Sequence, residues 1–296
     1  MKERLGLLMI VLLVVANVFL IPLAYKHAKG PTGGPGTAGP TREKVAEPSQ
    51  STDPDEGLAE QPADDAPLLM SSGGQLIVSS TRGACDGENA ASLRLSADRG
   101  RSFRGVEVDP RVKAVLAVEV TDGDRVLVLG ADESCRTLGY ESRDRGRSWT
   151  SVNPKRRWHL DAQPEARRVQ SPGGSLATPC VPRALSTVRN NVARLLCPNG
   201  RILSTPDEQE WTVAGRLKRA VAFRFPIPAV GFALAPQGDC EAAVMRTTDS
   251  GVTWEQLTCL EGGPPRGISG QDGTYAAMVG DTVFVSDDRA VSWRKP

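Results

Sequence analysis

Short runs of alternating hydrophobic and polar residues recur from about residue 70 to the C-terminus. Valine, isoleucine, leucine and aromatic residues dominate these runs, and a period of two predicts half-buried β-strands. One unit contains four such runs, at residues 114–120, 125–131, 136–142 and 148–152. A second unit repeats the order at residues 221–226, 229–235, 242–248 and 253–259. We therefore expect an all-β chain built from four-stranded antiparallel units.

A turn signal, TTDSGVTW at residues 247–254, closes one of these units. Asp249 can accept hydrogen bonds from nearby backbone N–H groups, Gly251 can adopt a positive φ, and Trp254 offers a large apolar face. Imperfect copies lie at residues 96–103, 142–149, 204–211 and 286–293. The residues expected to form these turns are Asp98, Gly100, Phe103, Asp144, Gly146, Trp149, Trp211, Asp249, Gly251, Trp254, Asp288 and Trp293.

The aromatic residues that close the five copies lie 39 to 46 residues apart, except for one interval of 62 residues. A period of this length is typical of β-propellers, in which each repeat forms one blade. We expect about five four-stranded blades in residues 67–296, with an insertion at residues 156–174 in the long interval. Residues 67–72 are expected to complete the last sheet and so close the ring.

The repeated turns resemble the Asp-box, or BNR, repeat Ser/Thr-x-Asp-x-Gly-x-Thr/Ser-Trp of sialidases, sortilin-type receptors and photosystem-assembly propellers. The chain resembles a membrane-anchored, actinobacterial-type member of this family. In that family the turn joins the third and fourth strands of a blade and has a structural role. Ala290 replaces the glycine of one copy, Phe103 replaces one tryptophan, and residues 204–211 lack both the aspartate and the glycine.

The N-terminal residues differ in composition from the repeats. Residues 5–25, from Leu5 to Tyr25, carry no charge and are long enough to span a bilayer. We expect residues 1–29 to be a signal anchor, with a cleaved signal peptide and secretion as the alternative. Residues 30–66 are rich in proline, glycine and acidic residues and carry a net charge of −6. This composition predicts a disordered linker.

All six cysteines follow the linker, and none forms a C-x-x-C pair. An even number downstream of an export segment predicts disulfides outside the cytoplasm. We expect Cys180 to pair with Cys197, Cys240 with Cys259, and Cys85 with Cys135, although spacing alone permits 15 arrangements. Only two histidines are present, so no metal site and no cofactor are expected.

Candidate binding residues lie in the insertion, because long loops on rigid scaffolds often carry function. They are Arg156, Arg157, Trp158, His159 and Asp161. A sialidase site needs three arginines, a tyrosine nucleophile with a glutamate partner, and an aspartate. The motif FRFP at residues 223–226 is similar to one in sialidases but follows the third turn, and only Tyr140 and Tyr275 lie in the repeats. No catalytic residue is assigned.

The sequence therefore predicts a membrane-anchored, extracytoplasmic propeller that acts as a protein- or ligand-binding scaffold rather than as an enzyme. A glycan-binding or sialidase-like protein is the alternative, and an assembly factor is a third interpretation. The weak net charge of the repeats does not favour nucleic-acid binding. The expected partners are the membrane, through residues 5–25, and a protein or glycan outside the cytoplasm.

Overall fold

A computed structural model describes residues 67–87, 89–121, 123–163 and 165–296. The predictions for the signal anchor at residues 1–29 and for the linker at residues 30–66 lie outside the described residues. Within the described part, no helix has the length and apolarity needed to cross a membrane. All the regular elements that the structure describes are β-strands.

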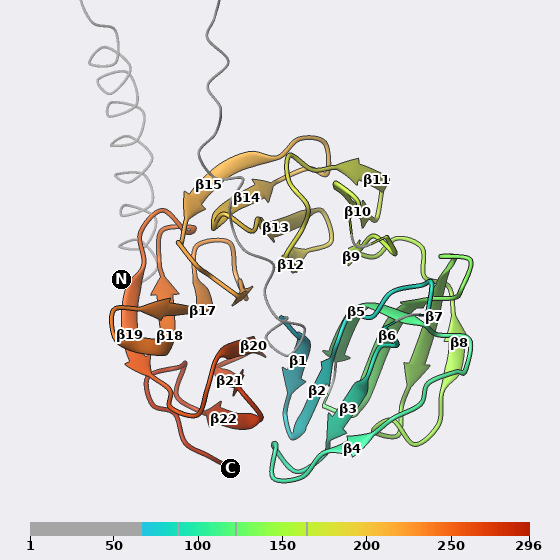
Figure 1. Cartoon of the computed structure of the whole chain (residues 1–296), viewed down its shortest axis with the longest axis horizontal. Coiled ribbons are helices and arrows are strands. Elements are labelled where there is room, and N and C mark those ends of the chain that lie inside the picture. The colour runs from blue at the N-terminus through green and yellow to red at the C-terminus, as the bar shows by residue number, and fades with distance from the viewer. Residues whose placement is uncertain (1–66, 88, 122, 164) are drawn as a thin grey trace, which may run out of the picture. The chain divides into compact units, whose positions relative to one another are not determined.

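Six antiparallel sheets surround a common centre and form a β-propeller (Figure 1). We call the sheets blades 1 to 6 in chain order. Blades 1 and 2 contain β1 (Leu69–Gly73), β2 (Leu76–Ser80), β3 (Leu93–Ser96) and β4 (Arg104–Gly105), then β5 (Ala114–Thr121), β6 (Arg125–Ala131), β7 (Thr137–Ser142) and β8 (Thr150–Val152). Blades 3 and 4 contain β9 (His159–Leu160), β10 (Arg168–Ser171) and β11 (Gly174–Ala177), then β12 (Ala184–Arg189), β13 (Val192–Leu196), β14 (Arg201–Thr205) and β15 (Thr212–Arg216). Blades 5 and 6 contain β16 (Ala222–Arg224), β17 (Gly231–Gln237), β18 (Cys240–Thr247) and β19 (Glu255–Cys259), then β20 (Pro265–Gln271), β21 (Thr274–Val279) and β22 (Thr282–Ser286).

The propeller has six blades, so the expectation of five was wrong. The predicted insertion is blade 3, a small sheet in which β9, β10 and β11 have two, four and four residues. This blade has no fourth strand among the described residues. The repeated turn follows the third strand of a blade, as it does after β22 in the three-stranded blade 6, but none of the five copies lies in blade 3. Counting turns therefore missed this blade.

The hydrophobic core lies between neighbouring blades. In β6 and β13 the side chains on both faces are buried, because each sheet packs against a sheet on either side. Val126 and Val128 pack toward blade 1, whereas Leu127 and Leu129 belong to a cluster with Ala162 at the start of blade 3. The central strands consequently show continuous apolar runs rather than a strict alternation.

Among the described strands, no blade combines strands from the two ends of the propeller sequence. The segment expected to complete the last sheet forms β1, which pairs with β2 and is the innermost strand of blade 1. Blade 6 meets it through one backbone hydrogen bond, from Leu68 N to Arg266 O at 2.9 Å, and through a 2.9 Å bond between the hydroxyls of Ser269 and Ser72. The outer side of β22 is covered by a single bridge to Arg294.

The repeated turns share one hydrogen-bond pattern, illustrated by residues 247–254. The Thr247 hydroxyl donates to Asp249 Oδ1 at 2.7 Å and accepts from Gly251 N at 2.9 Å. Thr253 donates to Asp249 through its backbone N–H at 2.9 Å and its hydroxyl at 2.5 Å. These bonds, led by that from the Thr253 hydroxyl, lower the pKa of Asp249 to about 2. Asp98, Asp144 and Asp288 have equivalent partners.

The degenerate turn at residues 204–211 makes a different connection. Its Glu208 carboxylate accepts hydrogen bonds from the Ser171 hydroxyl at 2.8 Å and from Gly173 N at 2.6 Å. Both donors belong to the turn between β10 and β11 of blade 3. Glu208, which lies in the copy that lacks the repeated aspartate and glycine, therefore connects blade 4 to the small blade 3 through hydrogen bonds.

Three disulfides join the cysteine pairs that we expected. The Cα atoms are 5.3 Å apart for Cys85 and Cys135, 5.9 Å for Cys180 and Cys197, and 5.8 Å for Cys240 and Cys259. The first bond links blade 1 to blade 2, and the other two lie at blades 4 and 5. Disulfides persist in oxidising compartments, so they indicate an extracytoplasmic environment.

Candidate functional site: the central cavity and its lip

The innermost strands of all six blades line one cavity at the centre of the ring. Its volume is about 1740 Å³, which is larger than a typical small-molecule site. Each innermost strand pairs with a neighbour on one side only. The cavity is therefore bordered by strand edges as well as by side chains.

The side chains around the cavity carry an excess of positive charge. Six arginines line it, against three carboxylates. The arginines are Arg82, Arg183, Arg189, Arg224, Arg246 and Arg289. Two of the carboxylates already have partners: Glu119 lies 3.5 Å from the Arg157 guanidinium, and Asp288 accepts hydrogen bonds within its turn. The third, Asp272, lies in the turn between β20 and β21. The cavity thus favours anionic ligands.

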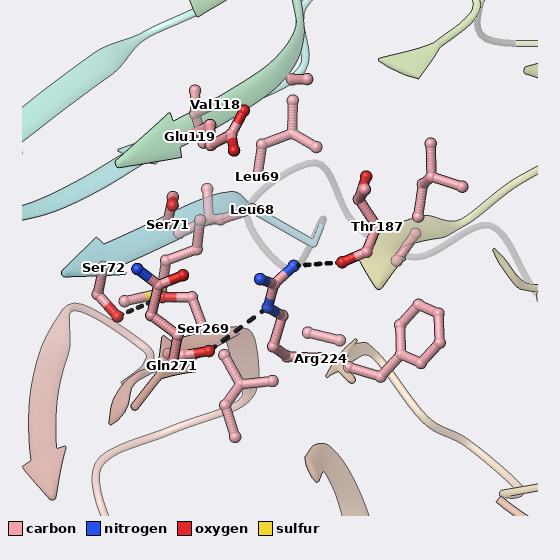
Figure 2. A pocket seen from close by; sticks show the side chains of 18 of the residues that line it. Leu68, Leu69, Ser71, Ser72, Val118, Glu119, Thr187, Arg224, Ser269 and Gln271 are labelled. Carbon is pink, nitrogen blue, oxygen red and sulfur yellow. Dashed lines mark hydrogen bonds between the residues drawn. The ribbon is translucent and has the colours of Figure 1, made fainter. Parts of the chain in front are cut away.

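Arg224 at the end of β16 extends into the middle of this cavity (Figure 2). Its Nη1 donates to Thr187 O at 3.0 Å and its Nε to Gly270 O at 3.4 Å, so two neighbouring blades hold the guanidinium. Among the described residues it forms no ion pair. Desolvation lowers the pKa of Arg224, although Glu119 partly opposes this shift. The guanidinium stays charged at neutral pH because its ordinary pKa is so high.

The local sequence explains why Arg224 faces the cavity. Side chains alternate along a strand, so the flanking residues Phe223 and Phe225 lie on the side of the backbone opposite Arg224, although part of Phe223 still borders the cavity. Both phenyl rings are buried in the contact between blades 4 and 5, where their centroids are 5.8 Å apart in an edge-to-face arrangement. Phe225 also meets the Trp254 ring edge-on at 6.0 Å. The two aromatic anchors therefore fix the backbone on either side of the arginine.

The loop after β16 and the turn after β22 contribute apolar residues to the cavity, which we call the apolar lip: Pro226, Ile227 and Val230 from the loop and Val291 from the turn. Ile227 is 53% exposed and Val291 is 70% exposed. Exposed aliphatic side chains next to a cavity are typical of a partner-binding surface.

Blade 4 holds this lip in place. Phe225 N donates to the Ser186 hydroxyl at 2.9 Å, and Arg194 Nη2 donates to Pro228 O at 3.0 Å. The Arg194 guanidinium also lies over the Phe225 ring, 5.1 Å from its centroid. A side chain at Gly231 would collide with that ring, because its Cβ would lie 2.6 Å from the ring carbons. The loop is therefore preorganised.

Two of the five residues predicted to bind a partner line the cavity, and three of the five are buried. Trp158 and His159 line the cavity wall and are each 5% exposed. Trp158 Nε1 donates to Asn190 O at 2.8 Å, and the ring meets Trp211 edge-on at 6.1 Å. His159 Nδ1 lies 2.9 Å from Arg157 O, and burial lowers the pKa of its imidazole.

The remaining predicted binding residues have separate roles. Asp161 is buried and pairs with Arg168 at 2.7 Å. Burial raises the pKa of Asp161, but hydrogen bonds from Arg168 and Gln163 outweigh this effect and lower it. Arg157 pairs with Glu119, and Arg156 is exposed with a φ of 65°. Their function as a binding surface stays a prediction.

The two tyrosines of the repeats do not form a nucleophilic site. The Tyr140 hydroxyl accepts a hydrogen bond from Arg111 Nη2 at 3.0 Å, and Tyr140 does not line the cavity. Tyr275 does line the cavity, but it is buried against Phe232, and burial raises the pKa of its phenol. A tyrosine nucleophile needs the opposite shift. The described residues also contain no group of side chains arranged to bind a metal ion.

Sequence reasoning found the motif FRFP but missed its role. The motif was compared with a sialidase signature, whereas the informative feature is the arginine between two apolar aromatics in a strand. That alternation predicts one charged side chain on the face opposite two buried rings. It could not show that this face borders the cavity, because the blade order around the centre is a property of the closed ring.

Comparisons with known proteins support no closer assignment. No family model matches the chain, and no curated protein matches it. YCF48 from Cyanidioschyzon merolae is similar in structure with a TM-score of 0.46 and 12% identity, over 74% of this chain and 81% of that chain. A structure of YCF48 bound to D1 peptide has a TM-score of 0.32 and 17% identity, over 78% and 67%. A nidogen/laminin complex has a TM-score of 0.45 and 11% identity, over 77% and 93%. The resemblance to Asp-box propellers stays an interpretation of the repeated turns.

Proposed function

We propose that the chain is an extracytoplasmic binding module that takes its partner at the central cavity and its apolar lip. The observation that carries this proposal is the position of exposed aliphatic residues beside a large, preorganised, basic cavity. Mixed apolar and charged surfaces of this kind suit protein partners, because apolar contact supplies affinity and charge supplies specificity.

Location is part of the proposal. The disulfides require an oxidising environment, and residues 5–25 would retain the chain at the membrane as a signal anchor. A phosphatase fused after Pro296 should be active outside the cytoplasm, and the mature protein should retain Met1 and sediment with membranes. Activity of the fusion only in the cytoplasm would refute the location, and a shortened soluble protein would refute the anchor.

A glycosidase is the less favoured function. The Tyr275 phenol is held in its protonated form, and one of the three cavity carboxylates is committed to a turn. Glu119 has Arg157 as its neighbour. Hydrolysis of a glycoside usually requires two carboxyl groups placed on either side of the glycosidic bond, whereas two of the three cavity carboxylates already have partners.

Photo-crosslinking in intact cells tests where the partner binds. A photoreactive amino acid replaces Ile227 or Val291 at the lip, and replaces Val213 in β15 as the matched control. Val213 is 64% exposed, comparable with the lip residues, but does not line the cavity. We expect partner adducts from positions 227 and 291 and none from position 213. Adducts from position 213 with none from the lip would refute the proposed site.

A further inference from the structure

We infer that the cavity binds an acidic polypeptide segment of a partner protein, with one carboxylate on the Arg224 guanidinium and a neighbouring aliphatic side chain on the apolar lip. This inference rests on the proposed function and specifies its ligand. It follows from three observations: an excess of positive over negative side chains in the cavity, a fixed guanidinium next to a hydrophobic surface, and the absence of an exposed aromatic ring among the described cavity residues.

Positive charge exceeds negative charge among the side chains that line the cavity, although Arg246 pairs with Glu255 at 3.6 Å. Arg224 is bound only by two backbone carbonyls, and Arg189 is an exposed cavity residue without an ion pair in the described structure. The carboxylate of Asp288 is occupied by Ser292 and Ser286. Glu119 attracts the Arg224 guanidinium but is itself paired with Arg157. A carboxylate entering the cavity would therefore meet two guanidinium groups, those of Arg189 and Arg224, that form no ion pair in the described structure, in surroundings less polar than water, where such bonds are strong.

The distance between the charge and the lip limits the ligand. Ile227 follows Arg224 by three residues, so the two positions are separated by at most ~10 Å of extended chain. An extended ligand spans that distance with a similar number of residues. The ligand segment therefore needs an aliphatic residue within about three positions of an aspartate or glutamate.

A polypeptide fits these features better than an acidic sugar polymer. Sugar rings pack their C–H faces on exposed aromatic rings, but the aromatic residues that line the cavity are all buried. These residues are Trp158, Phe223, Phe232 and Tyr275. The lip is aliphatic, and each innermost strand pairs with another strand on one side only, although Thr187 O and Gly270 O on the open sides already accept bonds from Arg224. An extended polypeptide can use both the aliphatic surface and the strand edges.

Binding of short labelled peptides to the full chain tests the inference by fluorescence anisotropy. One peptide alternates valine with glutamate, and the control peptide has glutamine in place of glutamate. We expect the acidic peptide to bind at least about 10-fold more tightly, because charged hydrogen bonds contribute more than neutral ones. Its affinity should fall as the salt concentration rises from about 0.1 M to about 0.5 M, because salt screens exposed charges. Equal binding of the two peptides would overturn the inference.

Two variants separate the cavity from general basic charge. Arg224→Gln should lower the affinity for the acidic peptide by about 10-fold or more, whereas Arg147→Gln should change that affinity by less than about 2-fold. Both changes remove one positive charge, but Arg147 is exposed and does not line the cavity. If Arg224→Gln fails to fold, Arg189→Gln serves the same purpose, since its side chain is exposed at the cavity. Unchanged affinity in a folded cavity variant would overturn the inference.

Two further arms identify the source of the ligand. A polyuronate oligomer that binds more tightly than the peptide would overturn the assignment to a polypeptide. Replacing the acidic residues in residues 30–66 by neutral ones tests whether this segment of the chain itself competes for the cavity. Unchanged peptide affinity would support a partner protein as the source of the ligand. A large increase in peptide affinity would overturn that assignment. If the lip still crosslinks to a partner but the Arg224 variant binds normally, the proposed function stands and this inference fails.

Discussion

Replacing Trp158 by alanine is the most informative single change, because two interpretations of this residue predict opposite results. As part of a binding loop, its loss should leave stability unchanged. In the structure it is instead 5% exposed and packs with Leu160, Val169 and Leu203 in the core between blades 3 and 4. Its indole N–H also donates to Asn190 O at 2.8 Å.

The expected cost follows from this packing. Truncation of a buried tryptophan costs about 3 to 5 kcal/mol, because the transfer free energy is lost and a cavity remains. Blade 3 has short strands and therefore few atoms that can relax into the space. With a urea slope of about 3 kcal/mol/M, a loss of about 4 kcal/mol lowers the unfolding midpoint by about 1.3 M.

Urea unfolding of the oxidised full chain, followed by far-UV circular dichroism, measures this midpoint without relying on tryptophan fluorescence. Trp158→Phe keeps part of the packing and should lose only about 1 to 2 kcal/mol. Arg156→Ala, at an exposed position two residues earlier, should stay within about 0.5 kcal/mol of the unchanged protein. A midpoint for Trp158→Ala equal to that of Arg156→Ala would refute the packing argument and restore the binding-loop hypothesis.

Three further predictions concern the turns, the buried histidine and the cross-links. Hydrogen bonds, led by that from the Thr253 hydroxyl, lower the pKa of Asp249 to about 2. The ionised carboxylate therefore contributes fully to stability above about pH 4, and this contribution is lost as the pH falls toward 2. The melting temperature of Asp249→Asn should consequently fall less over this pH range than that of the unchanged protein. Burial lowers the pKa of His159, so as the pH falls the imidazole is protonated in the unfolded chain before it is protonated in the folded chain. Stability should therefore decrease as the pH falls below about 6.5. His159→Gln should reduce this pH dependence, and the same pH dependence in the variant and the unchanged protein would contradict the prediction. Replacing Cys85 and Cys135 together by alanine opens a loop of 50 residues and should cost about 4 kcal/mol in the chain-entropy model, measured as a lower urea midpoint; a midpoint that does not move would contradict it.

The sequence predicted the elements that local chemistry determines. Alternation placed β5 to β8 within two residues of their observed ends, because strand residues reveal their period directly. The positions of the cysteines in the repeats suggested the pairing: Cys180–Cys197 and Cys240–Cys259 each lie within one repeat, and Cys85 and Cys135 follow the second strands of adjacent repeats. These properties depend on a few neighbouring residues or on the repeat itself.

The properties of the closed ring were not predictable in the same way. Blade 3 lacks the turn by which blades were counted, and its connection to blade 4 through Glu208 crosses 35 residues from Gly173. The cavity arises only when six innermost strands meet, so its charge depends on residues scattered from Arg82 to Arg289. No local pattern shows that Arg224 and Thr187 face each other.

The outer edge of blade 6 has a consequence for solubility. β22 contains the apolar run Val283, Phe284 and Val285, and among the described residues only the bridge between Val285 and Arg294 covers its free backbone. Arg294 pairs with Asp287 at 2.8 Å, and the Lys295 ammonium lies 5.7 Å from the centre of the Phe284 ring. Charged residues and proline beside an open strand discourage a second chain from adding to the sheet. The last three residues thus act against intermolecular strand pairing, and a chain without them should self-associate through β22 while keeping its fold.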